Sequence, residues 1–172
     1  MWWRSSALFA SLLAGLAALA LAGCGFQPLY GGTTAGGARL SEVMAGIEVT
    51  PIPGRVGQRL RNELIFANTG GGNPNQTRYR LDIVIKERVT DQLVQITGDA
   101  TGQVYQLDAT FKLFDTSGEV ILQGKAVSRA PYNRFQEIFA NVRARHDAEN
   151  RASRTVSESI KVQVAAHLSN AA

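Results

Sequence analysis

An alternation of apolar and polar residues runs through the middle of the chain. It restricts the folds that the chain can adopt more than any other feature of the sequence. In "TRYRLDIVIKERV" (77–89) the residues on one face are Tyr79, Leu81, Ile83 and Ile85. In "QVYQLDATFKLFD" (103–115) they are Tyr105, Leu107, Ala109, Phe111 and Leu113. A period of two is typical of a strand with one face buried and the other in water. These segments therefore predict two strands of one half-buried sheet.

Short turns connect these strands to one another and to a third. The segments "TGDATG" (97–102) and "DTSG" (115–118) are rich in the residues that form turns. The second turn leads into "EVILQGKAVSRA" (119–130), and the first strand can continue past a bend near 90–92. Because strands joined in series by short turns pair antiparallel, we expect a meander with one polar face.

Helical patterns lie on both sides of this meander. In "RVGQRLRNELIFANTGGG" (55–72), Val56, Leu60 and Leu64 are four residues apart, and the glycines at 70–72 predict the end of that helix. After a turn at 131–133, a longer helix has apolar residues at every fourth position, namely Ala148, Ala152, Val156, Ile160, Val164 and Leu168.

A short β-branched run at Val43–Ile52, ended by two prolines, precedes the first helix. The expected order is therefore β-α-β-β-β-α. This order predicts an α/β (α+β) two-layer sandwich, in which a mostly antiparallel four-stranded sheet carries both helices on its apolar face.

The N-terminal segment indicates export. Met1–Arg4 carries one positive charge, Ser5–Leu21 has no charge, and the small residues Ala22 and Gly23 precede Cys24. This is the layout of a secretory signal, although an apolar run of this length also permits a retained membrane anchor. The sequence "LAGC" resembles the lipobox of bacterial lipoproteins, which implies acylation of Cys24 as the first mature residue.

The lone cysteine fits this reading, because one thiol cannot form an internal disulfide. We expect a signal peptide at 1–23, an acylated N-terminus and flexible tether at 24–42, and a single domain at 43–172. The apolar tether residues Phe26, Leu29 and Tyr30 are compatible with packing on the domain edge or with contact to a partner or membrane.

The composition favours an envelope protein over a nucleic-acid binder. The chain has 18 Lys and Arg against 14 Asp and Glu, and loss of Arg4 with the signal lowers the net charge from +4 to +3. A mildly basic exported domain is attracted to anionic surfaces such as lipid phosphates. We expect no nucleic-acid partner, because the charges are not clustered with aromatic residues.

No pattern of catalytic or metal-binding residues stands out. His146 with Glu149 or Asn150 has the helical spacing of two metal ligands, but no third ligand is apparent, and a solvated helix face with ion pairs to Arg145 and Arg151 explains the cluster. We therefore expect neither an enzyme nor a metal site, and no cofactor other than the lipid on Cys24.

Four segments of the chain resemble the LPS-assembly lipoprotein family, LptE, and the opening segment resembles its alphaproteobacterial branch. They are "CGFQPLYG" (24–31), "GQRLRNEL" (57–64), "VYQLDATFKLFD" (104–115) and "RHDAENRASRTVSESI" (145–160). The resemblance implies a non-catalytic lipoprotein inside the outer-membrane barrel LptD. Such a protein supports assembly of the barrel, binds lipopolysaccharide and helps place it in the outer leaflet.

The expected location is the periplasmic side of the outer membrane, since Gly25 and Phe26 replace the aspartate that favours inner-membrane retention in enteric bacteria. Arginine binds phosphate in a bidentate manner, so basic side chains suit lipid A. The candidates are Arg88, Arg129, Arg134, Arg143 and Arg145. Each is also compatible with a simple solvated charge.

Two other functions are compatible with the same sequence. One is a lipid-anchored accessory subunit of an envelope ABC or lipid-transport system, and the other is a purely structural lipoprotein. The identity of a co-purifying partner distinguishes the three.

Overall fold

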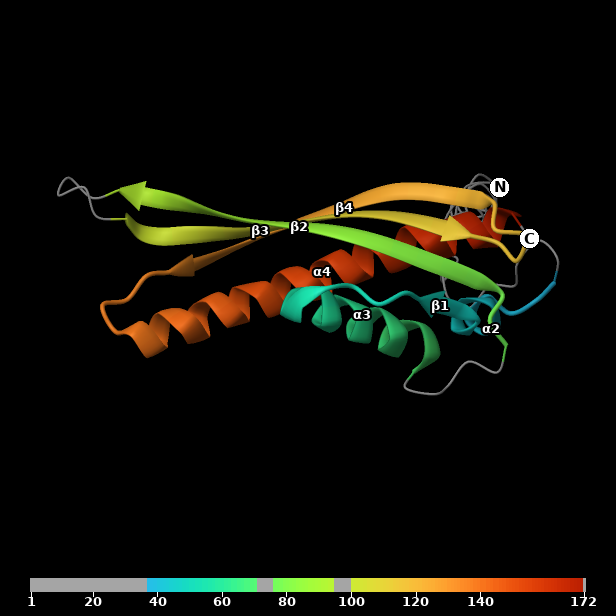
Figure 1. Cartoon of the computed structure of the whole chain (residues 1–172), viewed down its shortest axis with the longest axis horizontal. Helices are drawn as coiled ribbons and strands as arrows, with labels where there is room; N and C mark the ends of the chain where they lie inside the picture. Colours follow the sequence, from blue (N-terminus) through green and yellow to red (C-terminus); the bar gives the residue numbers. More distant parts are fainter. Residues whose placement is uncertain (1–36, 71–75, 95–99, 172) are drawn as a thin grey trace, which may run out of the picture.

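A computed structural model describes residues 37–70, 76–94 and 100–171. The chain forms a long, narrow structure of two layers, with a twisted sheet on one side and helices on the other (Figure 1). The helices are α2 (Leu40–Ala45), α3 (Gly54–Thr69) and α4 (Ile138–Ala171). The strands are β1 (Ile47–Val49), β2 (Tyr79–Val94), β3 (Ala100–Phe114) and β4 (Val120–Asn133). The predicted α+β sandwich is confirmed, with α2 as an additional helix.

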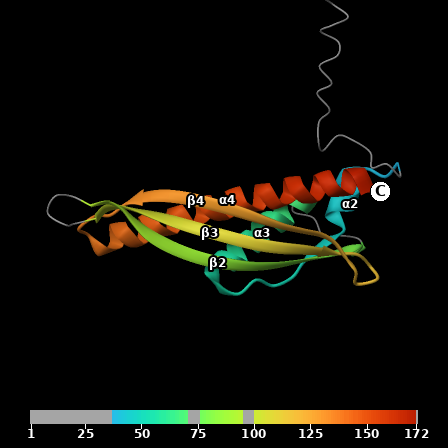
Figure 2. The same ribbon diagram turned by 90° about the horizontal axis from the view of Figure 1, so that it is seen from above.

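The sheet has the strand order β1-β2-β3-β4. The short β1 pairs parallel with β2, and the three long strands pair antiparallel in series, as the meander predicted. The helices α3 and α4 pack against each other, and α4 lies across β3 and β4 (Figure 2).

The alternation in β2 and β3 corresponds to the two faces of the sheet. Leu81 and Ile83 of β2 are buried, as are the five predicted residues of β3. Gly124 of β4 pairs with Phe111, and a Cβ built on this glycine would overlap the phenyl ring. The absence of a side chain at this position therefore leaves room for the buried phenyl ring of Phe111.

The core stripe of α4 is also confirmed, since all six predicted residues from Ala148 to Leu168 are buried. Four residues per repeat keep these side chains close to one line along the helix. The two alanines at the start of the stripe are completely buried, which is consistent with a close approach to the neighbouring layer.

The predicted turn at 131–133 is wrong. These residues continue β4 and pair with 102–104 of β3, so α4 begins only at Ile138. Pro131 is compatible with this strand because β4 is an edge strand, where a missing N–H costs no sheet hydrogen bond. The carbonyl of Pro131 instead accepts a hydrogen bond from Nη2 of Arg151 at 2.9 Å.

The start of the domain also differs from the prediction. Val43–Ala45 belongs to α2, and only Ile47–Val49 of the expected strand is extended. The buried Leu40 opens α2, so the folded part begins within the segment expected to be a tether. The predicted end of α3 is confirmed, because Gly70 has a φ of 64° and its N–H donates to the carbonyl of Phe66.

The β2–β3 hairpin is longer than expected. β2 runs without a break through 90–92, and residues 100–102, assigned to a turn, belong to β3. The predictions for the signal peptide, Cys24 and the tether up to 36, and for the turn at 97–99, lie outside the described residues.

Candidate functional site

The five arginines expected to bind lipopolysaccharide fall into two groups. Arg88 and Arg129 lie in one row across the polar face of the sheet, where each pairs with Gln106 of β3 between them. Nη2 of Arg88 donates to Asp108 at 2.8 Å, and Nε of Arg129 donates to Gln106 at 3.2 Å. These two arginines are therefore already engaged with neighbours on the sheet.

The other three arginines lie at the start of α4. Arg134 is in the connection between β4 and α4, and Arg143 and Arg145 are on the first turns of the helix. Nε of Arg145 donates to Glu149 at 3.0 Å. Among the described residues, Arg134 and Arg143 have no ion pair or side-chain hydrogen bond, and both are exposed. They are the two predicted cations that are open to a ligand phosphate.

Asn141 fixes the connection that carries Arg134. Its Oδ1 accepts a hydrogen bond from the N–H of Phe135, and its Nδ2 donates to the carbonyl of Phe135, both at 2.6 Å. Because one amide satisfies both backbone groups of Phe135, the connection is held against the first turns of α4.

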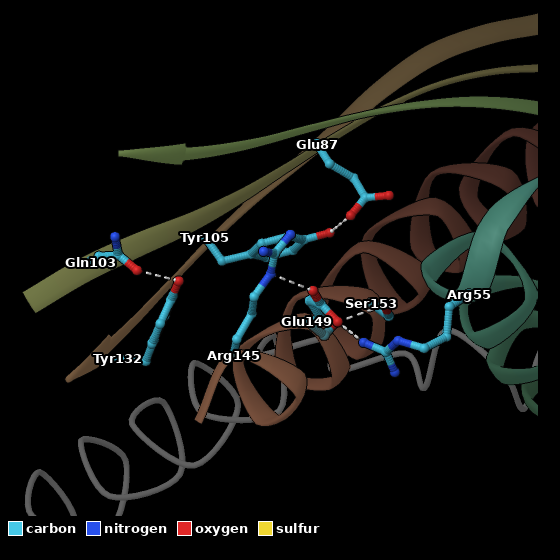
Figure 3. A network of polar contacts seen from close by, with 8 residues as sticks. All are labelled: Arg55, Glu87, Gln103, Tyr105, Tyr132, Arg145, Glu149 and Ser153. Carbon is cyan, nitrogen blue, oxygen red and sulfur yellow. Dashed lines mark hydrogen bonds and ion pairs between the residues drawn. The ribbon is translucent and has the colours of Figure 1, made fainter. Parts of the chain in front are cut away.

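A cavity of about 360 Å³ lies between this helix start and the end of the β2–β3 hairpin. Val89, Gln103, Tyr132, Arg134, Asn141, Val142 and Arg145 line it. On its sheet side the hydroxyl of Tyr132 donates to Oε1 of Gln103 at 2.6 Å (Figure 3). The cavity thus joins apolar walls to two of the predicted arginines.

A network of polar contacts lies behind the cavity, between the two layers (Figure 3). Glu149 is 5% exposed, and its carboxylate forms ion pairs with Arg145 and with Arg55 of α3. The expected ion pair between Arg145 and Glu149 is confirmed, but the expected solvated position is wrong for Glu149. The spacing of four residues within α4 predicts the ion pair between Arg145 and Glu149. The burial of Glu149 depends instead on the packing of α3 against α4.

Tyr105 forms a separate polar contact on the sheet side of this region. Its hydroxyl donates to Oε2 of Glu87 at 2.7 Å. Burial of the ring, followed by this hydrogen bond and the negative charge of Glu87, raises the pKa of Tyr105 above its ordinary value. The phenol therefore stays protonated to a higher pH than the phenol of an ordinary tyrosine.

The residues considered for a metal site, His146 and Glu149, lie in different surroundings. Glu149 is held by two cations while His146 is exposed, so the pair considered for a metal is not assembled. Within residues 37–70, 76–94 and 100–171, no three His, Cys, Asp or Glu side chains gather at metal-binding distance. No helix in the same ranges has the length and apolar character needed to span a membrane.

Four apolar residues beside Arg134 and Arg143 were not among the residues predicted for the site. Phe135, in the connection before α4, is exposed, and so are Ile138, Phe139 and Val142 on the first turns of the helix. Ile138, Phe139 and Val142 have the spacing of one helix face, and Phe135 lies in the connection just before the helix. The signal was therefore present in the sequence. It was overlooked because the regular stripe begins only at Ala148.

Comparison with known proteins shows where this fold occurs. No family model and no curated protein matches the chain. A candidate lipoprotein from Caulobacter crescentus CB15 matches with a TM-score of 0.65 and 19% identity, over 75% of this chain and 95% of that one. Rare lipoprotein B from Shewanella oneidensis matches with a TM-score of 0.54 and 12% identity, over 70% and 92% of the two chains.

A minor lipoprotein from Acinetobacter baumannii matches with a TM-score of 0.51 and 15% identity, over 70% of this chain and 91% of that one. The matches cover nearly the full length of all three proteins. The folded part of this chain therefore has the fold that these three lipoproteins share.

Proposed function

We propose that this protein is an outer-membrane lipoprotein of the LptE type, which occupies the lumen of the LptD barrel, assists assembly of the barrel and helps place lipopolysaccharide in the outer leaflet. The observation that carries this proposal is the fold match along nearly the whole length of three lipoproteins. The lipobox-like sequence at Cys24 provides the attachment that such a protein needs.

The segments that resemble the LptE family occupy defined places in this fold. "GQRLRNEL" lies within α3, where Gly57 is buried and a Cβ would overlap the backbone of Ile52. "VYQLDATFKLFD" covers most of β3, a strand that pairs with β2 on one side and β4 on the other. The resemblance thus includes positions with a clear structural reason, which supports the family assignment.

The outer face of the sheet suits a polar barrel interior. It carries the cations Arg80, Lys86, Arg88, Lys112, Lys125 and Arg129 and the anions Asp82 and Asp108. The lumen of a large outer-membrane barrel is polar, so a plug needs a hydrogen-bonding surface of this kind. Val84, Val120 and Val127 are exposed large apolar residues on this face.

Lipid attachment gives the location. A single acyl chain binds membranes only marginally, whereas two or more hold a protein stably. A fully acylated Cys24 would therefore keep the domain at the periplasmic side of the outer membrane. Lipopolysaccharide binding would use Arg134 and Arg143, because both guanidinium groups are exposed and lack a protein partner within the described residues.

Co-purification from outer membranes tests the proposal. The full chain with a C-terminal affinity tag is expressed in its own cells, extracted in mild detergent and analysed by mass spectrometry. We expect LptD as the main partner, and less of it with Cys24→Ala. An inner-membrane transporter as the main partner would instead indicate the accessory-subunit function, and recovery without any partner would indicate a purely structural lipoprotein.

Depletion of the protein gives a second readout. We expect misassembled LptD and less lipopolysaccharide at the cell surface, with no enzymatic product missing. Normal levels of both after depletion would overturn the proposed function.

A further inference from the structure

The start of α4 carries a group of exposed apolar side chains that the domain itself does not use. Phe135 is 49% exposed, Ile138 77%, Phe139 87% and Val142 47%. Single exposed apolar residues are ordinary on protein surfaces, but contiguous groups mark contact sites. We call these four residues the apolar tip.

The position of the tip explains why it stays uncovered. The buried stripe of α4 begins at Ala148, so the first turns of the helix extend beyond the well-packed core. Figure 1 shows this end of α4 at the extremity of the molecule, near the end of β4. Because no core packing requires apolar residues here, their apolar character points to a contact outside the domain.

The charges around the tip indicate the chemistry of that contact. Arg134 and Arg143 flank the apolar residues and have no charged partner among the described residues, and Glu137 is the single acidic residue between 134 and 146. Apolar side chains next to free cations complement an amphiphile that has acyl chains and a negative headgroup. The high exposure of Ile138 and Phe139 indicates that both side chains protrude from the surface. Protruding apolar side chains can insert among acyl chains more readily than they can pack on a flat protein surface.

The length of the molecule separates the tip from the first described helix, α2. α2, the first helix of the described chain, packs beside the C-terminal end of α4, whereas the tip is at the N-terminal end (Figure 2). The 34 residues of α4 span about 50 Å, which exceeds a bilayer hydrocarbon thickness of about 30 Å. A domain anchored at one leaflet and upright in a barrel can thus reach lipid on the opposite side.

From these observations we propose that the apolar tip contacts the acyl chains of lipopolysaccharide while Arg134 and Arg143 face its phosphates. This inference rests on the proposed function, and it assigns the acyl contact to residues on the first turns of α4. The adjacent cavity, lined in part by Val142 and Arg134, offers room for the same ligand.

Site-specific photocrosslinking in cells tests the inference on the full, anchored chain. Phe139→p-benzoylphenylalanine places a light-activated group at the tip. Phe66→p-benzoylphenylalanine is the matched control, because Phe66 is also an exposed phenylalanine on a helix and is 66% exposed on α3. We expect lipopolysaccharide adducts at position 139 and none at position 66. Adducts at 139 with protein only, adducts with phospholipid only, or equal labelling at both positions would overturn the proposal.

A binding measurement separates this inference from the proposed function. Ile138→Ser combined with Phe139→Ser should weaken lipopolysaccharide binding about tenfold, since burial of one large apolar side chain is worth at least that factor. Phe66→Ser should leave it unchanged. If LptD still co-purifies and lipopolysaccharide binds the double variant normally, the tip assignment fails and the proposed function stands. If LptD does not co-purify with the parent protein, the proposed function itself fails.

Discussion

Arg145 and Glu149, one turn apart on α4, form an ion pair of 3.0 Å whose carboxylate also pairs with Arg55 of α3. Glu149 is buried, so the two cations provide the compensation that a buried carboxylate requires. Arg145 thus has a structural partner, unlike Arg134 and Arg143. A test of lipopolysaccharide binding therefore has to distinguish the loss of a ligand contact from the loss of the ion pair between Arg145 and Glu149.

Glu149→Gln should lower the free energy of unfolding by about 2 kcal/mol, because it leaves two guanidinium groups facing a neutral side chain. Urea denaturation followed by circular dichroism measures this loss. Asp147→Asn is the matched control, since Asp147 forms an exposed pair with Arg151 at the same helical spacing and should cost less than about 1 kcal/mol. Equal costs for the two variants would contradict the role assigned to Glu149.

Tyr105→Phe should cost about 1 kcal/mol at neutral pH through loss of the hydrogen bond to Glu87. The raised pKa of Tyr105 means that folding favours the neutral phenol. This stabilisation is complete below the pKa of an unfolded tyrosine, about 10, and decreases as the pH rises above it. Between pH 10 and 12 the free energy of unfolding of the parent should therefore fall relative to that of the variant. Urea denaturation at a series of pH values measures both free energies of unfolding. A constant difference between parent and variant across this interval would contradict the link between ionisation of Tyr105 and folding.

Ile83→Asp or Phe111→Asp should unfold the domain, because each places an unpaired carboxylate between sheet and helix. Loss of the far-ultraviolet circular dichroism signal reports this outcome. Arg80→Ser lies on the opposite face of β2 and should shift the free energy of unfolding by about 1 kcal/mol or less, even though Arg80 contacts Asp82 and the Phe114 ring. A folded Phe111→Asp protein would refute the face assignment.

Neutralising Arg129, Arg134, Arg143 and Arg145 together should weaken lipopolysaccharide binding, most strongly at low salt, because exposed charges are screened within about 10 Å at 0.1 M salt. The double variant Arg134→Gln and Arg143→Gln avoids the Glu149 pair and should lose about tenfold in affinity. Arg154→Gln, on the exposed side of α4, serves as the control. Unchanged affinity of the fourfold variant at low salt would move the ligand surface elsewhere, with Arg78, Arg80 and Lys86 as the next candidates.

Cys24→Ala should leave an unprocessed precursor without lipid, because the chain has no other thiol. Metabolic labelling with palmitate measures acylation, and the electrophoretic mobility of the protein measures processing. Labelling at the level of the parent would show that Cys24 is not the acylated residue.

Local periodicity by itself determined which faces of β2, β3 and α4 are buried. Ile83, Phe111 and Ile160 lie where the spacing of apolar residues placed them, since a strand or helix of fixed period can hide only one side. Gly70 ended α3 as predicted, because the left-handed conformation it adopts is a local property of glycine. These features need no knowledge of distant parts of the chain.

The extent of β4 and the burial of residues near the start of α4 depend on the tertiary structure. Pro131 continues β4 because no strand pairs on its outer side, and Glu149 is buried because α3 brings Arg55 to it. Ile138, Phe139 and Val142 have the spacing of a core stripe, yet they are exposed because the start of α4 extends beyond the packed core. Periodicity shows that a face is apolar, but only the arrangement of the other elements determines whether that face is covered.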